Sequence, residues 1–351
     1  MNQQRTKRRL QQRNGFSLIE LLVVIIVIGL LVALILPAIQ SSCVGSRKLT
    51  CLNNMRNVGL GVINFSSGAN SELPLLVDPN MENASENANA AYDNLSWCIT
   101  VLPFLDHVGF RQRWDATASL AAQSGATAEQ IRALADLNQI RFPLLSCPDD
   151  QSNTDPGALS YAVNVGYVTA NYHSANDVAH RPDSSDGGLD GDVATTADIP
   201  VKFATGVFWR PYESRMSLDI ISEADGLAQT LMLSENLQAG EWADQDTGSL
   251  GFGVDLQGVY SSGTTTLALP SGFNLRNPTS ATDSRIGSNL TAAKATAWRP
   301  SSNHPSGAVN VIFCDGSGKS FTPQMDPGVY SRLLTPAGLQ YGQAVVDETS
   351  F

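Results

Sequence analysis

The sequence is poor in the residues that most enzymatic and nucleic-acid-binding sites require. Its 351 residues include four histidines, and it has no G-x-S-x-G motif, no P-loop and no dinucleotide-binding glycine fingerprint. Five of the 22 basic residues lie in the first 15 positions, so the rest of the chain carries 17 basic and 33 acidic residues, a net charge of −16. Nucleic-acid binding needs a basic patch, so this composition excludes a nucleic-acid partner. The lack of a recognisable nucleophile arrangement argues against an enzyme.

The five cysteines form neither a Cys-x-x-Cys pair nor a Cys/His cluster with zinc-site spacing. Cys43 and Cys51 lie on one expected helix, about 12 Å apart along its axis, and cannot bridge each other there. Disulfides form in exported proteins, and buried free thiols are the alternative. The candidate disulfide partners are Cys51, Cys98, Cys147 and Cys314, and an odd cysteine must remain.

Only one long apolar run is present. Phe16 to Leu36 contains a single charge, Glu20, and five cations without any acid precede it. A basic leader followed by about twenty apolar residues predicts a membrane-inserted helix with a cytoplasmic N-terminus. A carboxylate in hydrocarbon costs roughly 2.5–3.5 kcal/mol or more, so Glu20 needs a partner. The alternative is a signal peptide or signal anchor with a chance carboxylate, although an ordinary signal peptide has a shorter apolar core that precedes its cleavage site.

The helical pattern continues after this run and becomes amphipathic. Apolar residues with spacings of 4, 3, 4 and 3 mark one face of a helix: Cys51, Met55, Val58, Val62 and Phe65. Glycines 45, 59 and 61 weaken the pattern, each by on the order of 1 kcal/mol relative to Ala. We therefore expect one long helix whose first half spans a membrane or packs in a filament, and whose second half docks on a globular head. The expected divisions are residues 1–15 (leader), 16–36, 37–65 (the two helix halves) and 66–351 (head).

The segment Gly15-Phe16-Ser17-Leu18-Ile19-Glu20 resembles the processing site of type IV prepilins and type II secretion pseudopilins. The resemblance implies that a prepilin peptidase and methyltransferase cuts after Gly15 and N-methylates Phe16. It also implies that Glu20 pairs with the terminal amine of a neighbouring subunit, and that Pro37 stands where pilins often carry a helix-kinking proline. The implied partners are the peptidase, other pilin-like subunits, the assembly machinery and the inner membrane. The implied location is the bacterial inner membrane, single-pass with an exported head, or a periplasmic or surface filament.

Six further stretches resemble, in order, those of a large prepilin-like family whose exported domain has no assigned function. They are Leu49 to Leu60, Asn94 to Asp106, Leu144 to Asp150, Ser160 to Gly166, Asp219 to Glu235 and His304 to Gly316. The family signature places nine residues between its His and Asp-Gly, whereas ten separate His304 from Asp315 here, which puts the strand register in doubt. The resemblance implies structural roles for His304, Asp315, Gly316, Asp225 and Gly226.

The local patterns of the head predict both strands and a helix. Alternating residues from Val309 to Phe313 and the turn residues Asp315-Gly316 predict a two-residue hairpin turn within residues 304–321. A strand should follow Gly226, at residues 230–233. The one other clear helix spans residues 127–138, capped by Thr127 with Gln130 three positions on. We therefore expect an α+β fold, a long pilin-type N-terminal helix followed by a head built on an antiparallel sheet.

Few side chains of the head suggest chemistry. Asp183, Asp186, Asp190 and Asp192 lie in a glycine-rich stretch that is a weak Ca²⁺ candidate, because Ca²⁺ takes several oxygens from flexible loops; a solvated acidic loop is the alternative. The spacing of His173, Asp177 and His180 would allow them to bind a metal ion together, but exposed histidines are the simpler interpretation. His304 we expect to be structural, with its imidazole bonding backbone carbonyls before the hairpin. The five tryptophans could face sugar rings, although core packing is commoner.

These observations predict a non-enzymatic, pilin-like or pseudopilin-like subunit with no cofactor other than the weak Ca²⁺ candidate. The alternative is a membrane-tethered envelope module that binds a glycan or a protein and does not polymerise. An exported hydrolase would need a nucleophile or metal set that the sequence does not display.

Overall fold

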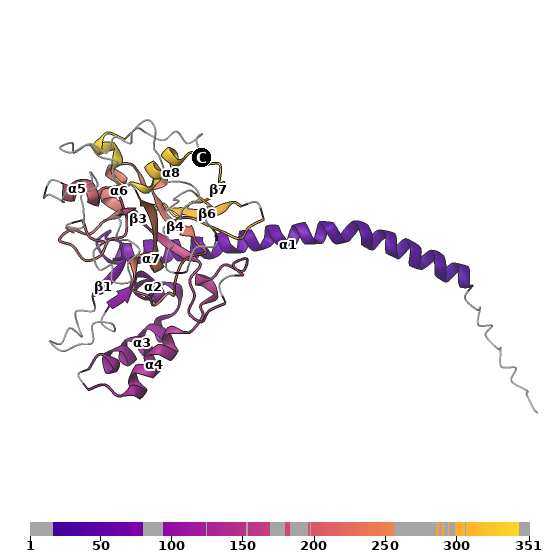
Figure 1. Cartoon of the computed structure of the whole chain (residues 1–351), viewed down its shortest axis with the longest axis horizontal. Coiled ribbons are helices and arrows are strands. Elements are labelled where there is room, and N and C mark those ends of the chain that lie inside the picture. Colours follow the sequence, from indigo (N-terminus) through magenta and orange to yellow (C-terminus); the bar gives the residue numbers. More distant parts are fainter. Residues whose placement is uncertain are drawn as a thin grey trace, which may run out of the picture. The chain divides into compact units, whose positions relative to one another are not determined.

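The computed structural model divides the chain into two compact units, Met1–Ser46 and Arg47–Phe351, and the second is called the head unit below. Figure 1 shows their elements. The expected boundaries at residues 15, 36 and 65 stay predictions. The structure describes residues 17–79, 94–123, 125–151, 154–168, 180–182, 196, 198–255, 286–287, 290, 294, 299–305 and 307–343.

Helix α1 (Leu18–Gly68) is a single helix of 51 residues, as the sequence predicts, and Pro37 lies inside it. In the first unit the apolar residues from Leu18 to Leu36 are exposed. Apolar side chains occur all around this part of the helix, which is typical of a segment covered by a membrane or by other helices. This segment is the one stretch, among the described residues, that is long and apolar enough to cross a membrane. The helix ends at Gly68, shortly before Asn70 and Ser71, both of which have positive φ.

The head unit is built on a five-stranded sheet with the order β5-β3-β4-β6-β7. The α+β class is confirmed, but the sheet is mixed rather than wholly antiparallel, since β3 and β5 pair in parallel. The short helix α7 (Thr247–Leu250) leads directly into β5, which then runs along β3 in the same direction. A separate antiparallel pair joins β1 to β2. The strands are β1 (Val77–Pro79), β2 (Asn94–Ser96), β3 (Tyr161–Val168), β4 (Leu231–Glu235), β5 (Gly251–Asp255), β6 (Val309–Phe313) and β7 (Gly318–Phe321).

The second half of α1 packs on this sheet through the face that its periodicity predicts. Cys51, Met55, Val58 and Val62 are fully buried, and Phe65 meets Phe104 edge-on with ring centroids 5.7 Å apart. A glycine leaves room for this packing: a Cβ on Gly59 would lie 3.0 Å from both Ile312 Cγ2 and Met232 Cε. The glycine that weakens the helical pattern therefore lies directly against side chains of β4 and β6.

The predicted C-terminal hairpin is formed by β6 and β7. Its turn is a three-residue loop, residues 314–316, and not the expected two-residue turn, because Phe313 N–H bonds Ser317 O and Gly316 N–H bonds Phe313 O, both at 2.9 Å. Only Gly316 adopts a positive φ, of 81°. The Asp315 side chain instead accepts a hydrogen bond from Ser317 N–H at 2.8 Å, which closes the turn from the side.

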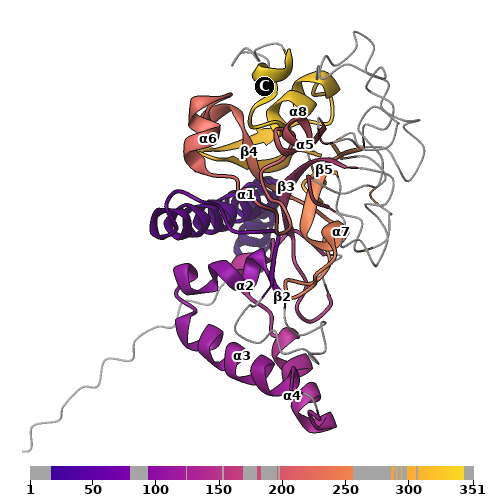
Figure 2. The same cartoon turned by 90° about the vertical axis from the view of Figure 1, so that its left-hand side faces the viewer.

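The predicted helix at 127–138 is α4 (Ala128–Asn138), and its capping box is present. It is not the only further helix, because α3 (Val108–Ala121) has 14 residues but too weak an apolar period to be predicted. Figures 1 and 2 show α3 and α4 paired at one end of the head unit, with α5, α6 and α8 at the other. The remaining helices are α2 (Trp97–Val101), α5 (Asp198–Phe203), α6 (Leu218–Glu223), α8 (Pro327–Leu334) and the 3-10 turns η2 (Leu102–Leu105), η3 (Pro143–Leu145), η5 (Leu227–Gln229) and η6 (Gly338–Tyr341).

Candidate functional site

The N-terminal processing segment is described only from Ser17 onward. Glu20 lies in the first turn of α1, where its Oε2 accepts a hydrogen bond from Ser17 N–H at 2.9 Å. Gly15 and Phe16, between which cleavage is expected, lie outside the described residues. Within the first unit Glu20 is therefore bonded by one backbone N–H of its own turn, close to the expected cut.

A second site lies in the head unit, where four distant chain segments meet. Cys51 of α1 forms a disulfide with Cys147, which follows η3 at a sequence separation of 96. Glu235 ends β4, and His304 lies shortly before β6. We call His304, Asp149, Glu235 and Asn310, together with this disulfide, the His304 cluster. The other candidate partners, Cys98 and Cys314, are free and buried, whereas Cys43 is free and exposed.

His304 is held by two carboxylates, and not by backbone carbonyls as expected from the sequence. Its Nδ1 lies 2.8 Å from Asp149 Oδ2 and its Nε2 lies 3.0 Å from Glu235 Oε1, with the imidazole almost wholly buried. Burial by itself lowers the pKa of His304. The hydrogen bonds and negative charges of Glu235 and Asp149 outweigh burial and raise the pKa above its ordinary value. The protonated ring is thereby favoured in the disulfide-bonded state.

The carboxylates are themselves positioned by neighbours. Glu235 accepts two hydrogen bonds from Asn310, from the backbone N–H at 2.8 Å and from the side-chain amide at 2.9 Å. Asp149 Oδ1 lies 3.6 Å from the Arg47 guanidinium, which is half exposed. Asn310 is fixed in turn, because its carbonyl oxygen accepts a bond from Ser320 and its amide also reaches Lys48 O. Each described member of the network therefore has a defined orientation.

The sulfurs of the disulfide border the same network. Cys147 Sγ lies 3.9 Å from Glu235 Oε1, a contact and not a hydrogen bond, because a disulfide sulfur carries no proton. One donor atom from each of Cys51, Cys147, Glu235 and His304 lies within 4.8 Å of the others. This is the one group in the described part of the chain that has the donors for a metal ion.

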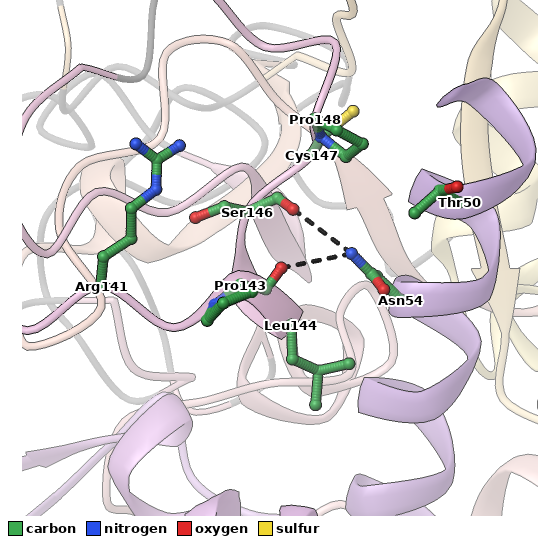
Figure 3. Close-up of a pocket in the computed structure, with 8 residues that line it drawn as sticks. All are labelled: Thr50, Asn54, Arg141, Pro143, Leu144, Ser146, Cys147 and Pro148. Carbon is green, nitrogen blue, oxygen red and sulfur yellow. Dashed lines mark hydrogen bonds between the residues drawn. The ribbon is translucent and has the colours of Figure 1, made fainter. Parts of the chain in front are cut away.

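A groove of about 550 Å³ opens beside Cys147. Figure 3 shows Asn54 of α1 reaching across it to the carbonyl oxygens of Pro143 and Ser146, at 3.2 and 3.4 Å. Arg141 and Pro148 at its rim are exposed, so the groove is open to solvent. It is lined by Thr50, Asn54, Arg141, Pro143, Leu144, Ser146, Cys147 and Pro148.

The other residues singled out by the sequence lie apart from this cluster. Asp225 accepts hydrogen bonds from Gly338 N–H and Leu339 N–H at 2.8 and 3.0 Å, while Gly226 has a φ of 95°. His180 is buried and stacks on Trp209 at 4.6 Å, which corrects the expectation of an exposed histidine. The four tryptophans that the structure describes are buried in the core. The Ca²⁺ candidates Asp183, Asp186, Asp190 and Asp192, with His173 and Asp177, lie outside the described residues.

Sequence reasoning missed Asp149, Glu235 and Asn310 as partners of His304. A signal was present, because each lies in one of the six stretches that carry the family resemblance: Asp149 in Leu144 to Asp150, Glu235 at the end of the fifth stretch, and Asn310 in the sixth. The pattern could not show that these stretches meet in space.

Two family models match the chain, one over the N-terminal segment and one over most of the head unit. Residues 10–36 match the prokaryotic N-terminal methylation motif, and residues 45–328 match the family described as a protein of unknown function (DUF1559). Neither a curated protein nor a solved structure matches the chain. The first match supports a pilin-like precursor with a membrane-anchoring helix, and the second spans most of the head unit. The chain therefore belongs to this family of unknown function and carries a prepilin-type N-terminal methylation motif.

Proposed function

We propose that this protein is a pilin-like structural subunit that a prepilin peptidase cleaves between Gly15 and Phe16 and methylates on Phe16. The mature chain is then anchored in the inner membrane through Leu18–Leu36 and assembles with other pilin-like subunits into a surface or secretion-associated filament. The observation that carries this proposal is the methylation motif over residues 10–36, which includes the exposed apolar segment Leu18–Leu36, whose one charge is Glu20.

In this proposal the carboxylate of Glu20 directs assembly, because it needs a positive charge that a neighbouring subunit can provide. Within hydrocarbon its carboxylate costs roughly 2.5–3.5 kcal/mol or more unless it is neutralised. The hydrogen bond from Ser17 N–H satisfies part of this need but supplies no positive charge. Cleavage after Gly15 creates an amine on Phe16, and the amine of a neighbouring subunit provides the missing charge. Each helix then enters the filament with its carboxylate paired, and the surrounding Leu, Ile and Val side chains pack against those of other subunits.

A structural role also fits the chemistry of the head. Both ring nitrogens of His304 face carboxylates, and neither is hydrogen-bonded to a hydroxyl that could act as a nucleophile. The sulfurs nearest to it are joined in a disulfide and are not thiolates. We therefore propose a non-enzymatic subunit.

The test is incorporation of variants into filaments, measured by immunoblotting of sheared surface fractions and by electron microscopy. Gly15→Ala should block cleavage, and mass spectrometry should find the leader intact. Glu20→Ala should be cut but excluded from filaments. Glu20→Gln is the matched control, because it keeps the acceptor for Ser17 N–H without the charge; it should also be excluded. Incorporation of Glu20→Gln at the wild-type level would contradict the charge-pairing mechanism.

A membrane-tethered binding module is the second candidate, favoured by the open groove beside Cys147. In that case α1 is only an anchor, and wild-type protein with a methylated Phe16 stays in the membrane fraction. The presence of wild-type protein in sheared fibres separates the two functions.

A further inference from the structure

We propose that Cys51, Cys147, Glu235 and His304 form a Zn²⁺ site when the Cys51–Cys147 disulfide is reduced. The head unit would then alternate between two mutually exclusive states, a disulfide without metal and a dithiolate that holds zinc. This inference concerns the head alone and does not depend on whether the protein assembles into filaments.

The donor set is the first argument. Zinc prefers four ligands drawn from Cys sulfur, His nitrogen and carboxylate oxygen, arranged as a tetrahedron. Such a tetrahedron places its donors roughly 3–4 Å from one another. Here one atom from each of the four side chains already lies within 4.8 Å of the others, and all four residues are buried. Reduction frees the two sulfurs from their bond, so that small side-chain rotations complete the geometry.

The hydrogen bonds around the donors are the second argument. A zinc-bound imidazole usually donates its other N–H to a carboxylate, which fixes the orientation of the ring. His304 has this arrangement, since Nδ1 is bonded to Asp149 at 2.8 Å while Nε2 lies 3.0 Å from the Glu235 carboxylate. Glu235 is held by the two bonds from Asn310. The surroundings of a metal ligand set are therefore already built.

Charge also fits a divalent cation. Two thiolates, Glu235 and a neutral His304 around Zn²⁺ give a net charge of −1, and Arg47 offsets the further charge of Asp149 from 3.6 Å away. The carboxylates of Asp149 and Glu235, which lie on either side of the His304 ring at 2.8 and 3.0 Å, suit a cation at this position.

The groove brings solvent close to one of the two cysteines. Cys147 lines it, and its exposed rim opens to solvent. A small dithiol or a thiol–disulfide exchange protein is the class of reductant that the proposal requires. The donor's two thiols become a disulfide, and two electrons with two protons convert the Cys51–Cys147 bond into two thiols. Zn²⁺ then displaces both thiol protons, together with the proton on Nε2 where one is present.

The experiment uses the full chain in detergent micelles, reduced with a phosphine under argon and then titrated with Co²⁺, a spectroscopic substitute for zinc. We expect one Co²⁺ per chain, intense visible absorption typical of a tetrahedral site and a thiolate-to-cobalt charge-transfer band. One equivalent of Zn²⁺ should abolish both signals. The oxidised protein, treated in the same way, should give neither.

Variants assign the ligands. Cys51→Ser and His304→Gln should lose the tetrahedral spectrum, whereas the exposed Cys43→Ser should keep it. Asp149→Asn should keep the spectrum but bind about 10–100-fold more weakly, because it removes only the carboxylate behind the imidazole. Circular dichroism establishes that each variant is folded before titration.

Co²⁺ binding by the reduced wild-type protein tests the proposed zinc site even where a variant fails to fold. A reduced wild type that binds no Co²⁺, or binds it with the weak absorption of an octahedral site, would overturn the proposal. So would an unchanged spectrum in His304→Gln, or a reduced wild type that unfolds and is not restored by Zn²⁺.

Discussion

The two halves of helix α1 contain similar apolar side chains but differ completely in burial. Val27 in the first half is 51% exposed, whereas Val58 in the second half is fully buried against the sheet. The first half is apolar all around, so no single face is distinguished. The second half has one apolar stripe that matches the surface of β4 and β6. Periodicity, and not apolar content, therefore decides which half is covered by its own chain.

Two cysteines of α1 show the same difference in burial between the halves. Cys43 and Cys51 lie on the same helix, only eight residues apart, yet Cys43 is free and exposed while Cys51 is buried and cross-linked to Cys147. The stripe that packs on the sheet also brings Cys51 to the His304 cluster. The docked face of the helix therefore also supplies a member of the cluster.

The largest change in stability is expected when an aspartate replaces a valine in the second half of α1, and the same replacement in the first half is the control. Val58→Asp buries a carboxylate against the sheet and should cost about 5 kcal/mol or more, comparable to the whole stability of a typical domain. Val27→Asp should leave unfolding of the head unchanged in detergent. Denaturant titration followed by the fluorescence of the buried tryptophans measures both. Equal effects of the two variants would remove the distinction between the halves.

The next largest effect concerns the cross-link. Under oxidising, metal-free conditions, replacing both Cys51 and Cys147 by Ser should lower the free energy of unfolding by on the order of 4 kcal/mol, because the disulfide closes a loop of nearly a hundred residues. Cys43→Ser should have no effect. The same denaturant titration gives the values. A double variant as stable as the wild type would mean that the helix is held to the sheet without help from the disulfide.

The smallest effects, of opposite sign, are expected for two glycines of α1. Gly45→Ala meets no atom within 4 Å and should stabilise the helix by about 0.5–1 kcal/mol. Gly59→Ala gains the same propensity but forces its Cβ against Ile312 and Met232, and overpacking costs about 1–3 kcal/mol. We expect a net loss for Gly59→Ala by thermal unfolding. A gain of stability in both variants would show that the helix can move away from the sheet.

Much of the architecture could be predicted because it depends on local patterns. The run from Leu18 to Leu36, the stripe that starts at Cys51 and the capping box at Thr127 are each encoded within a few helical turns. The hairpin was also predictable. Its turn is one residue longer than the expected two-residue turn, and within it only Gly316 has a positive φ. Helix α3 was missed because its sequence mixes Gly, Thr and charged residues without a clear apolar period.

The candidate site could be predicted only in part. His304 was identified through its resemblance to a signature, but its partners Asp149 and Glu235 are 155 and 69 residues away in the sequence. The parallel pairing of β5 with β3 is likewise a long-range event. Such pairings depend on how whole elements pack together, and no periodicity or turn signal records them.

Local patterns are enough to predict an apolar helix with one carboxylate near its start, a prepilin-type processing motif, and a second helical half with a docking face. These features follow from composition and from the 3.6-residue period of the helix. The pairing of Cys51 with Cys147 and the position of His304 between Asp149 and Glu235 emerge only in the folded head. The physical reason is that packing the helix on the sheet, and the strands on one another, brings together side chains whose local sequences carry no information about their partners.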